Sequence, residues 1–587
     1  MSSFYGELKR RNVVRVAVVY IIAAWFVMQV VDVMFPALNL PLWTVTAVAA
    51  LVLIGFPFAI ILAWAFELTP DGVKRERDVD RSESITSKTG KKLNQLTIAA
   101  LAIAVTFLIV DKFYLSVEDS QPAAEQNAEV TEVRKSIAVL PFVNMSGDPE
   151  NEYFSDGLSE ELLNVLAKIP GLHVAGRTSS FKFKGHNEDL RIIGDQLNVA
   201  NILEGSVRKS AETVRITVQL VDAESGFHLW SETFDRQLTD IFAVQDEIAR
   251  HVADALKVNL LGQTAGSSQR VHGTNNIEAY DYYLQGLHFR NSYNQENMQK
   301  SLEAFEKAIE LDPEYARAWA QLAITQWFAS AEFSGHDYHA SQARVKDSAT
   351  RAMQLDDTVG EAYMALAMRQ FAYEFDFESA KETLQKGLEI EPNNPRSLAL
   401  LAAITGASGD LEGAIRFSEQ SLDIDPLSSR QLRELGDLHR AIGDFDASYE
   451  TYQHVLDLQP EIARIHGRLG LLFAEQGDLD AAEKEFRLEP VEWVREYGAI
   501  MIPIMRGERD LWEERLSAYI EKYNESIAFQ IAELYSVAGE LDHAYEWLEV
   551  ALEVRDPGLI WVLTFSFTSG VRNDDRWPEF RKRAFGN

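Results

Sequence analysis

The residues best suited to chemistry in this sequence are arginines that recur at matching places in a helical repeat. Six of them share the face that the first helix of each repeat turns inward: Arg369, Arg396, Arg430, Arg433, Arg440 and Arg464. A guanidinium is planar and presents parallel N–H donors, so it can pair with both oxygens of a carboxylate. The sequence therefore predicts a groove that binds an acidic peptide or a free carboxylate. The alternative is that these arginines pair with neighbouring glutamates on a solvated face.

No catalytic signature accompanies the arginines. The sequence lacks Gly-x-Ser-x-Gly, a phosphate-binding Gly-x4-Gly-Lys-Ser/Thr, His-Glu-x-x-His and an EF-hand loop. Asp148, Glu150 and Asp156 resemble a metal cluster, but each stands where a turn or a helix start needs such a residue. The stretch Arg177-Thr-Ser-Ser180 lacks the glycine spacing of a phosphate loop. We therefore predict a binding protein with no cofactor. An enzyme hidden in the middle of the chain stays open, because carboxylates on separate elements leave no local motif.

The element that positions the arginines is a 34-residue repeat. Gly-Asp dipeptides and prolines each recur at this step: Gly409-Asp410, Gly443-Asp444 and Gly477-Asp478, with Pro392, Pro426 and Pro460. Glycine begins a turn and proline ends a helix, so this spacing predicts pairs of helices. The length resembles that of the tetratricopeptide repeat (TPR), which implies an all-α solenoid over residues 276–587 and a peptide-binding inner face. A ten-residue insert falls near residues 328–339, and the period is lost from Leu488 to about Phe529.

Residues 136–262 have a different pattern of apolar and polar residues, which predicts an α/β (α+β) domain. A short buried strand at Ile137-Ala-Val-Leu-Pro-Phe142 is followed by helices and by strands that alternate apolar and polar residues. The stretches Tyr153-Phe-Ser-Asp-Gly-Leu158 and Leu203-Glu-Gly-Ser-Val207 resemble the TolB amino-terminal-like (FlgO-like) domain of bacterial envelope and signalling proteins. That resemblance implies an interaction or sensory module. In such relatives the domain and TPRs are often joined to a nucleotidyl cyclase or a winged helix, and we expect neither effector here because only about 12 residues precede the first apolar run.

Three apolar runs precede this domain. They cover Val13–Phe35, Leu42–Phe66 and Leu93–Val110, and about 20 apolar residues are enough to span a bilayer. The sequence thus predicts a three-helix membrane anchor over residues 13–115. Basic residues cluster in residues 1–12 and in the loop 67–92, which predicts that both are cytoplasmic and that residues after about 115 are periplasmic, at a bacterial inner membrane. Residues 116–135 and 263–275 are predicted linkers.

The composition limits which classes of partner and site are expected. The formal net charge is −33, and because residues 1–114 carry 12 basic and 9 acidic residues, the remainder carries −36. So acidic a body repels phosphate backbones, which argues against nucleic acid as a partner. The chain has no cysteine, so disulfides, thiolate chemistry and cysteine-based zinc sites are excluded.

Together these features predict a multidomain fold class: three transmembrane helices, an α/β TolB-N-like domain and an all-α TPR solenoid. The predicted function is a non-enzymatic, inner-membrane-anchored periplasmic scaffold or sensor that binds protein or peptide partners. One alternative is a transmembrane signal transducer that relays periplasmic binding through loop 67–92 to a cytoplasmic partner. A minor alternative is a cyclase-associated or other enzyme activity, for which no catalytic motif is seen.

Overall fold

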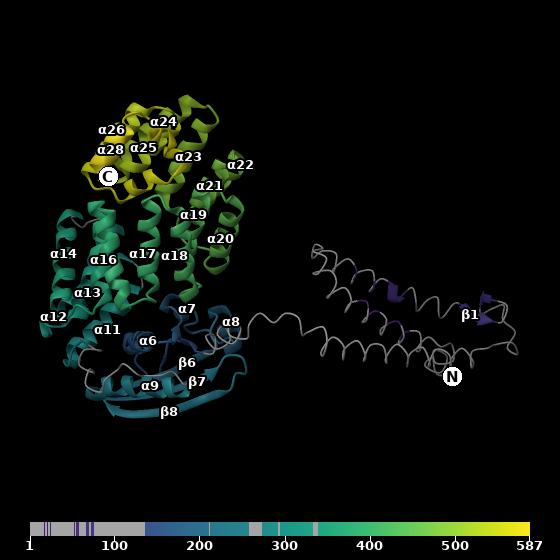
Figure 1. Cartoon of the computed structure of the whole chain (residues 1–587), viewed down its shortest axis with the longest axis vertical. Coiled ribbons are helices and arrows are strands. Elements are labelled where there is room, and N and C mark those ends of the chain that lie inside the picture. Colours follow the sequence, from purple (N-terminus) through teal and green to yellow (C-terminus); the bar gives the residue numbers. More distant parts are fainter. Residues whose placement is uncertain are drawn as a thin grey trace. The chain divides into compact units, whose positions relative to one another are not determined.

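The computed structural model describes residues 135–210, 212–256, 273–291, 294–332 and 338–586, together with short pieces before residue 76. The chain divides into two compact units, Met1–Asn127 and Ala128–Asn587. In the first unit, strands β1 (Phe66–Thr69) and β2 (Gly72–Arg75) form an antiparallel hairpin. The second unit contains the sheet and the helical array (Figure 1).

The prediction of three transmembrane helices is contradicted. Within the described residues, no helix is long and apolar enough to cross a membrane. The predicted multi-pass inner-membrane location depended on those helices, and it is therefore wrong. Most of the three apolar runs lies outside the described residues, and the last residue of the second run, Phe66, begins strand β1. Apolar composition indicates only that a segment avoids water, whereas a span also needs an unbroken helix of about 20 residues.

The second unit begins with a mixed six-stranded sheet. Its strands are β3 (Ser136–Val139), β4 (Val143–Asn144), β5 (His173–Val174), β6 (Asn201–Ser210), β7 (Thr213–Asp222) and β8 (His228–Gln237). The order is β5-β3-β6-β7-β8, with β4 also beside β6. Strand β3 runs parallel to β5 and β6, while β6, β7 and β8 form an antiparallel meander. The apolar–polar alternation predicted for residues 213–222 is that of a strand with one buried face.

Both faces of strand β3 are buried. Ile137 and Val139 belong to the core under helices α6 (Glu152–Ala167) and α9 (Ile241–Ala255), whereas Ala138 packs on the opposite face with residues of helix α8 (Leu190–Leu197). Successive strand residues point to opposite faces, so a strand covered on both sides reads as a continuous apolar run.

The same core continues into the helical array. It includes Tyr280, Tyr283 and Leu284 of helix α11 (Ile277–Asn291), which packs on α6. A Cβ at Gly157 of α6 would lie 2.8 Å from the Leu284 side chain. The absence of a side chain at Gly157 therefore lets the two helices approach closely, which joins the α/β domain and the array into one body.

The array consists of antiparallel helix pairs, eight of them in the described residues. The pairs are α11 with α12 (Gln295–Leu311), α13 (Ala316–Glu332) with α14 (Tyr338–Leu355), α15 (Gly360–Arg369) with α16 (Phe377–Ile390), α17 (Pro395–Ala407) with α18 (Leu411–Ile424), α19 (Ser429–Ala441) with α20 (Phe445–Leu458), α21 (Ile465–Glu475) with α22 (Leu479–Leu488), α23 (Glu492–Met505) with α24 (Arg509–Tyr523), and α25 (Ala528–Val537) with α26 (Leu541–Glu553). A π-helical turn, η5 (Gln370–Glu374), extends α15.

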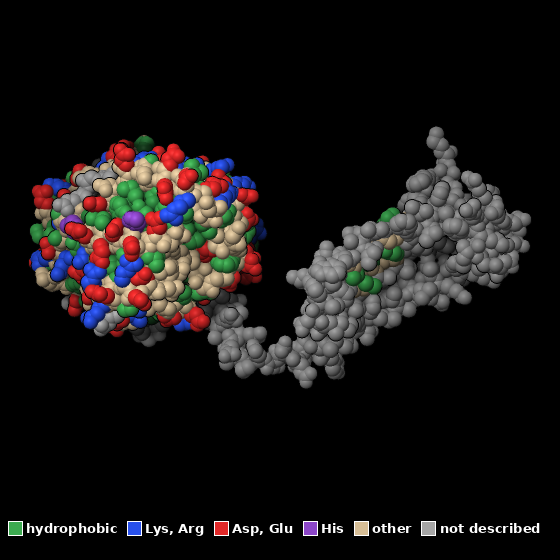
Figure 2. Space-filling model, turned by 90° about the horizontal axis from the view of Figure 1, so that it is seen from above, with side chains coloured by type: hydrophobic (Ala, Val, Ile, Leu, Met, Phe, Trp, Pro, Cys, Tyr) green, Lys and Arg blue, Asp and Glu red, His purple; other side chains and the backbone are tan. Residues whose placement is uncertain are grey.

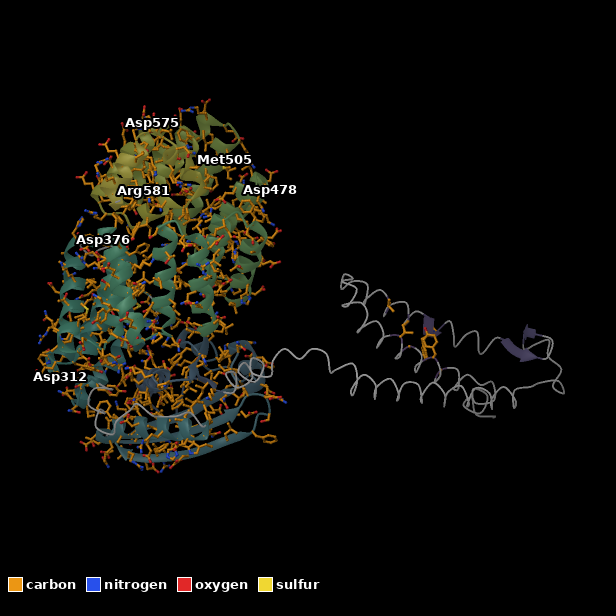
Figure 3. All side chains as sticks on the ribbon, viewed as in Figure 1. Asp312, Asp376, Asp478, Met505, Asp575 and Arg581 are labelled. Carbon is orange, nitrogen blue, oxygen red and sulfur yellow. The ribbon has the colours of Figure 1, made fainter. Side chains whose placement is uncertain are left out.

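In each turn the glycine of the Gly-Asp dipeptide reverses the chain and the aspartate caps the next helix. Gly443 has φ of 82°, a left-handed conformation that favours glycine, and Asp444 then accepts a hydrogen bond from the Ala447 N–H at 3.1 Å. Asp376 and Asp478, labelled in Figure 3, cap α16 and α22 in the same way. Beyond Leu488 the glycines persist at Gly507 and Gly539, but glutamate follows them and caps neither helix. The repeat thus continues where its sequence signature fades.

The C-terminal segment closes the array on itself. After α26 come η7 (Pro557–Leu563), η8 (Ser566–Thr568), α27 (Ser569–Arg572) and α28 (Trp577–Phe585). The Phe585 ring lies 5.8 Å from Phe375 and 5.6 Å from Phe377, centroid to centroid. The last helix therefore packs on the third helix pair, so the solenoid curls far enough for its end to meet its early repeats.

Candidate binding face of the repeat array

The first helices of the pairs form the inner layer of the array. Neighbouring first helices contact one another directly, as α13 does α15, α19 does α21 and α23 does α25. Contacts also cross the interior: the Arg430 guanidinium of α19 lies 5.7 Å from the Phe328 ring of α13, three helix pairs earlier. The inner face is therefore a curved surface on which residues from distant repeats meet.

Three of the six predicted arginines are paired with glutamates. Arg369 is buried, forms an ion pair with Glu374 and donates from Nε to the Gln342 carbonyl at 2.8 Å. Arg440 is buried and paired with Glu475. Arg430 is exposed and pairs with Glu434 one helical turn away, at 3.0 Å. These three arginines thus pair with nearby glutamates, as the alternative to a carboxylate-binding groove predicted.

Arg433 and Arg396 have no carboxylate partner among the described residues. Arg433 is half-buried, its Nη1 donates to the Ala463 carbonyl at 3.4 Å, and its Nε is buried without a hydrogen bond. Burial, and then the nearby charge of Arg468, lower the pKa of Arg433 to about 10. Arg396 is exposed in the first turn of α17, and no carboxylate engages its guanidinium within the described part of the chain.

Arg464 differs from the other five arginines because its backbone adopts a left-handed conformation. It precedes α21 with φ of 71°, and its N–H donates to Glu489 at 2.9 Å. Its guanidinium lies 5.5 Å from the Trp493 ring. The side chain thus makes a cation–π contact with an aromatic ring in the first turn of α23.

Part of the inner face is filled by the chain's own C-terminal segment. The Arg440 guanidinium lies 5.0 Å from the Phe565 ring, and Ser566 donates to the Glu475 carboxylate that pairs with Arg440. Arg572 in turn donates to the Phe565 carbonyl at 2.6 Å. Arg440 therefore holds the segment that occupies this part of the inner face.

The α/β domain meets the array through buried polar contacts. Both Nη atoms of Arg317 in α13 donate to the two oxygens of Glu161 in α6, at 2.6 and 2.8 Å. In helix α7 (Arg177–Phe181), the Ser179 N–H donates to Asp425 at 2.7 Å, and the Ser179 hydroxyl accepts from the Leu427 N–H at 2.8 Å. We refer to this contact region of α6 and α7 with α11, α13 and the α18–α19 turn as the seam.

The acidic residues considered for a metal have other roles. Asp148 caps the short helix η3 (Pro149–Asn151) by accepting from the Glu150 N–H, as a turn residue should. Asp156 does not begin a helix: it lies inside α6, is buried, and pairs with Lys184 at 2.6 Å and His288 at 3.1 Å. Burial raises the pKa of Asp156, but hydrogen bonds from His288 and Lys184 outweigh burial and lower it.

One acidic cluster that the sequence did not indicate lies between β8 and α9. Ligand atoms of Glu232, Glu247 and His251 lie within 4.8 Å of one another. The ring of His251 stacks on Trp230 at 5.1 Å, and Glu247 accepts from Arg236 at 3.4 Å. These contacts account for the arrangement without an ion.

Sequence reasoning also missed Arg290 and Arg317 of the seam, and it considered Arg177 only as part of a phosphate-loop candidate. Arg177, Arg290 and Arg317 belong to α7, α11 and α13, so no single motif or period joins them. Arg317 is separated from Glu161 by 156 residues in the chain. Only the docking of α6 against the array brings these side chains together.

Family models match both parts of the second unit. Residues 133–251 match a model described as "HilA/YgeH-like transcriptional regulator, second domain", and residues 292–315 and 433–492 match tetratricopeptide repeat models. The chain therefore contains TPRs, as the 34-residue period predicted. The finer prediction of a TolB amino-terminal-like domain is not shown by these matches.

A curated relative shares part of the chain. The protein named "Putative adenylate cyclase 3" of Rhizobium meliloti (strain 1021) is 45% identical over 196 residues, which is 32% of this chain and 32% of the relative. The chain thus matches about a third of that protein's length.

Solved TPR structures are also similar to the array. A thermophilic TPR protein of Thermus thermophilus is 16% identical, and the match covers 31% of this chain and 92% of that one, with a TM-score of 0.27. The Pseudomonas aeruginosa pilF protein is 18% identical, with 38% and 97% covered and a TM-score of 0.29. At these values the likeness concerns the TPR fold and carries no argument about function.

Proposed function

We propose that this chain is a protein-binding TPR module that captures an acidic segment of a partner on the inner face of its array, at Arg430, Arg433 and Arg464. The observation that carries the proposal is Arg433, a half-buried guanidinium with an unpartnered Nε and no carboxylate partner in the described part of the chain. A buried donor left without an acceptor is costly, so an incoming carboxylate would relieve that cost.

The charge around Arg433 favours an anionic partner. Arg468 lies close enough to lower the pKa of Arg433. Asp437, to which Arg468 donates, also accepts from the Tyr452 hydroxyl at 2.8 Å. The local excess of positive charge contrasts with the strongly acidic body as a whole. On the face shown in Figure 2, acidic and basic side chains intermingle, so selectivity for an acidic segment depends on the inner face.

The test uses the full chain and a defined probe. A short fluorescent Glu-rich peptide should bind the wild type, and the double variant Arg430→Glu/Arg433→Glu should raise its Kd by about tenfold or more. A Lys-rich peptide of equal length should bind the double variant better than the wild type. The matched control is Arg581→Glu, an exposed arginine of the C-terminal helix α28 (Figure 3). Equal affinity of the wild type and the double variant for the Glu-rich peptide would overturn the proposal.

A second candidate is a role in nucleotidyl cyclase signalling, and the 45% identity to the Rhizobium protein favours it. In this role the second unit would supply the regulatory surface of cyclase activity. The measurement is cyclic AMP formation from ATP by the purified full chain. Activity above that of a heat-denatured sample would support catalysis by the chain itself, and its absence would leave the binding role.

A further inference from the structure

Strand β8 forms a long open edge of the six-stranded sheet. The strand order ends at β8, which pairs with β7 on one side and with no described strand on the other. Strand β5, at the opposite end of the order, has only two residues, whereas β8 has ten. Figure 1 shows β8 along the lower margin of the second unit, with no described helix or strand beyond it. Such an edge presents a row of backbone N–H and C=O groups to any strand that can pair with it.

The backbone groups on the open side belong to alternate residues of β8. Leu238, directly after the strand, donates its N–H to the Glu212 carbonyl at 2.7 Å and so continues the ladder with β7. In an antiparallel ladder the direction of the backbone groups alternates from residue to residue. The residues whose groups point away from β7 are therefore Ser231, Thr233, Asp235 and Gln237. Native edge strands often carry lysine or proline to prevent pairing, and β8 contains neither.

The charges of β8 are arranged so that the strand complements a second copy of itself. Glu232 and Arg236 lie two residues before and two residues after Phe234, whose side chain is buried. When two copies pair antiparallel with Phe234 opposite Phe234, Glu232 of each copy lies opposite Arg236 of the other. Opposite charges at facing positions of two strands attract. The same register places Thr233 opposite Asp235, so the residues with outward backbone groups face one another.

The other symmetric registers nearby are less favourable. Centring the pair on Glu232 places two glutamates opposite each other, and centring it on Asp235 places two aspartates opposite each other. Like charges at facing positions repel. Centring the pair on Thr233 avoids repulsion but loses both ion pairs. The charge pattern therefore selects the register centred on Phe234.

The existing contacts of the two charged side chains are long and leave them near the edge. Arg236 is exposed, lies 3.4 Å from Glu247 and donates to the Asp235 carbonyl at 3.1 Å, a bond that an incoming strand would replace. Glu232 lies 3.7 Å from His251. The carboxylates of Glu232 and Glu247 lie within 4.8 Å of each other. A guanidinium from a second copy would therefore approach a locally negative part of this face.

We propose that β8 pairs antiparallel with β8 of a second copy of this chain, with Phe234 at the two-fold axis, so that two six-stranded sheets become one continuous sheet. The exposed side chains of Phe227 and Leu229, at 75% and 49%, lie at the beginning of β8. Because the two strands run in opposite directions, these apolar groups lie beside η4 (Leu238–Asp240) of the second copy. The dimer goes beyond the peptide-binding function and does not depend on it.

Sedimentation velocity of the full chain over a range of concentrations tests the dimer. The wild type should dimerise, and Arg236→Glu should raise the dimer Kd by about tenfold or more, because two ion pairs become two repulsive pairs. The double variant Glu232→Arg/Arg236→Glu should restore dimerisation, since it reverses both charges and keeps them complementary. Arg581→Glu is the matched control and should dimerise as the wild type does. Far-UV circular dichroism shows whether each variant is folded.

Disulfide crosslinking tests the register. The chain has no cysteine of its own, so a mixture of Thr233→Cys and Asp235→Cys chains offers few alternative bonds. In the proposed register these two positions face each other with Cα atoms about 5.5 Å apart, a separation that a disulfide can span. Oxidation should give a covalent heterodimer on a non-reducing gel, and a mixture of Thr233→Cys with Arg581→Cys should not.

Two results would overturn the proposal. A wild type that stays monomeric would do so, and would leave the edge of β8 for a strand of a different protein. A dimer that neither responds to Arg236→Glu nor crosslinks between positions 233 and 235 would also do so, because its interface would lie elsewhere. Arg430→Glu/Arg433→Glu should dimerise as the wild type does even if it loses the Glu-rich peptide, so the two proposals can fail separately.

Discussion

The ion pair between Glu161 and Arg317 allows the sharpest test of how the α/β domain and the array are joined. Glu161 is fully buried and Arg317 is 7% exposed, and two hydrogen bonds of 2.6 and 2.8 Å connect them. The ring of Tyr283 lies 5.3 Å from the same guanidinium, and Asn164 donates to Glu161 at 3.2 Å. Replacing Glu161 with Gln removes the negative charge and leaves Arg317 charged in a site that water cannot reach.

Breaking one partner of a buried pair typically costs about 3–5 kcal/mol, which corresponds to a factor of roughly 100 or more in the folding equilibrium. We therefore expect Glu161→Gln to lower the free energy of unfolding by about that amount. Removing both charges should cost less, because an apolar side chain at position 317 has no charge to desolvate. The double variant Glu161→Gln/Arg317→Met should accordingly be more stable than Glu161→Gln alone.

Urea unfolding followed by far-UV circular dichroism measures these differences. The control is Glu549→Gln, which removes the exposed pair between Glu549 and Arg583 at 3.0 Å and should cost no more than about 1 kcal/mol. If Glu161→Gln costs no more than the control, or if the double variant is no more stable than the single one, the pair does not hold the seam as described.

Three further predictions concern stability. Burial raises the pKa of Glu533 to about 7, so between pH 4.5 and 7 the folded chain keeps a proton that the unfolded chain loses. The free energy of unfolding should therefore fall by about 3 kcal/mol as the pH rises through this range. Glu533→Gln should abolish this pH dependence in urea unfolding. Gly443→Ala should cost about 1 kcal/mol, because φ is 82° although nothing lies within 4 Å of the added Cβ; an unchanged thermal midpoint would contradict this. Phe585→Ala removes the ring that packs on Phe375 and Phe377, so limited proteolysis should cut near α28 sooner than in the wild type.

Local signals in the sequence were enough to predict the repeat. Gly443 and Asp444 act within a few residues of their own position, one by its left-handed backbone and the other by capping the next helix. The TPR matches agree with the period that these residues define. Where glutamate replaces the capping aspartate after Gly507, the period is lost although the helix pair remains.

Hydropathy was a weaker guide. It predicted three membrane spans, whereas no helix in the described residues is long and apolar enough for one. An apolar run records only a preference for leaving water, and a protein interior satisfies that preference as well as a bilayer does.

The sequence by itself determined the repeat of helix pairs, because its turn and capping residues act on neighbours a few positions away. Only the tertiary structure decided which inward arginines find a carboxylate. Arg440 is engaged by Glu475 and by a segment that returns from the end of the chain, whereas Arg433 and Arg396 have no described carboxylate to pair with. Whether a charge finds a partner depends on contacts between residues far apart in sequence, and those contacts exist only once the array has curled and the α/β domain has docked against it.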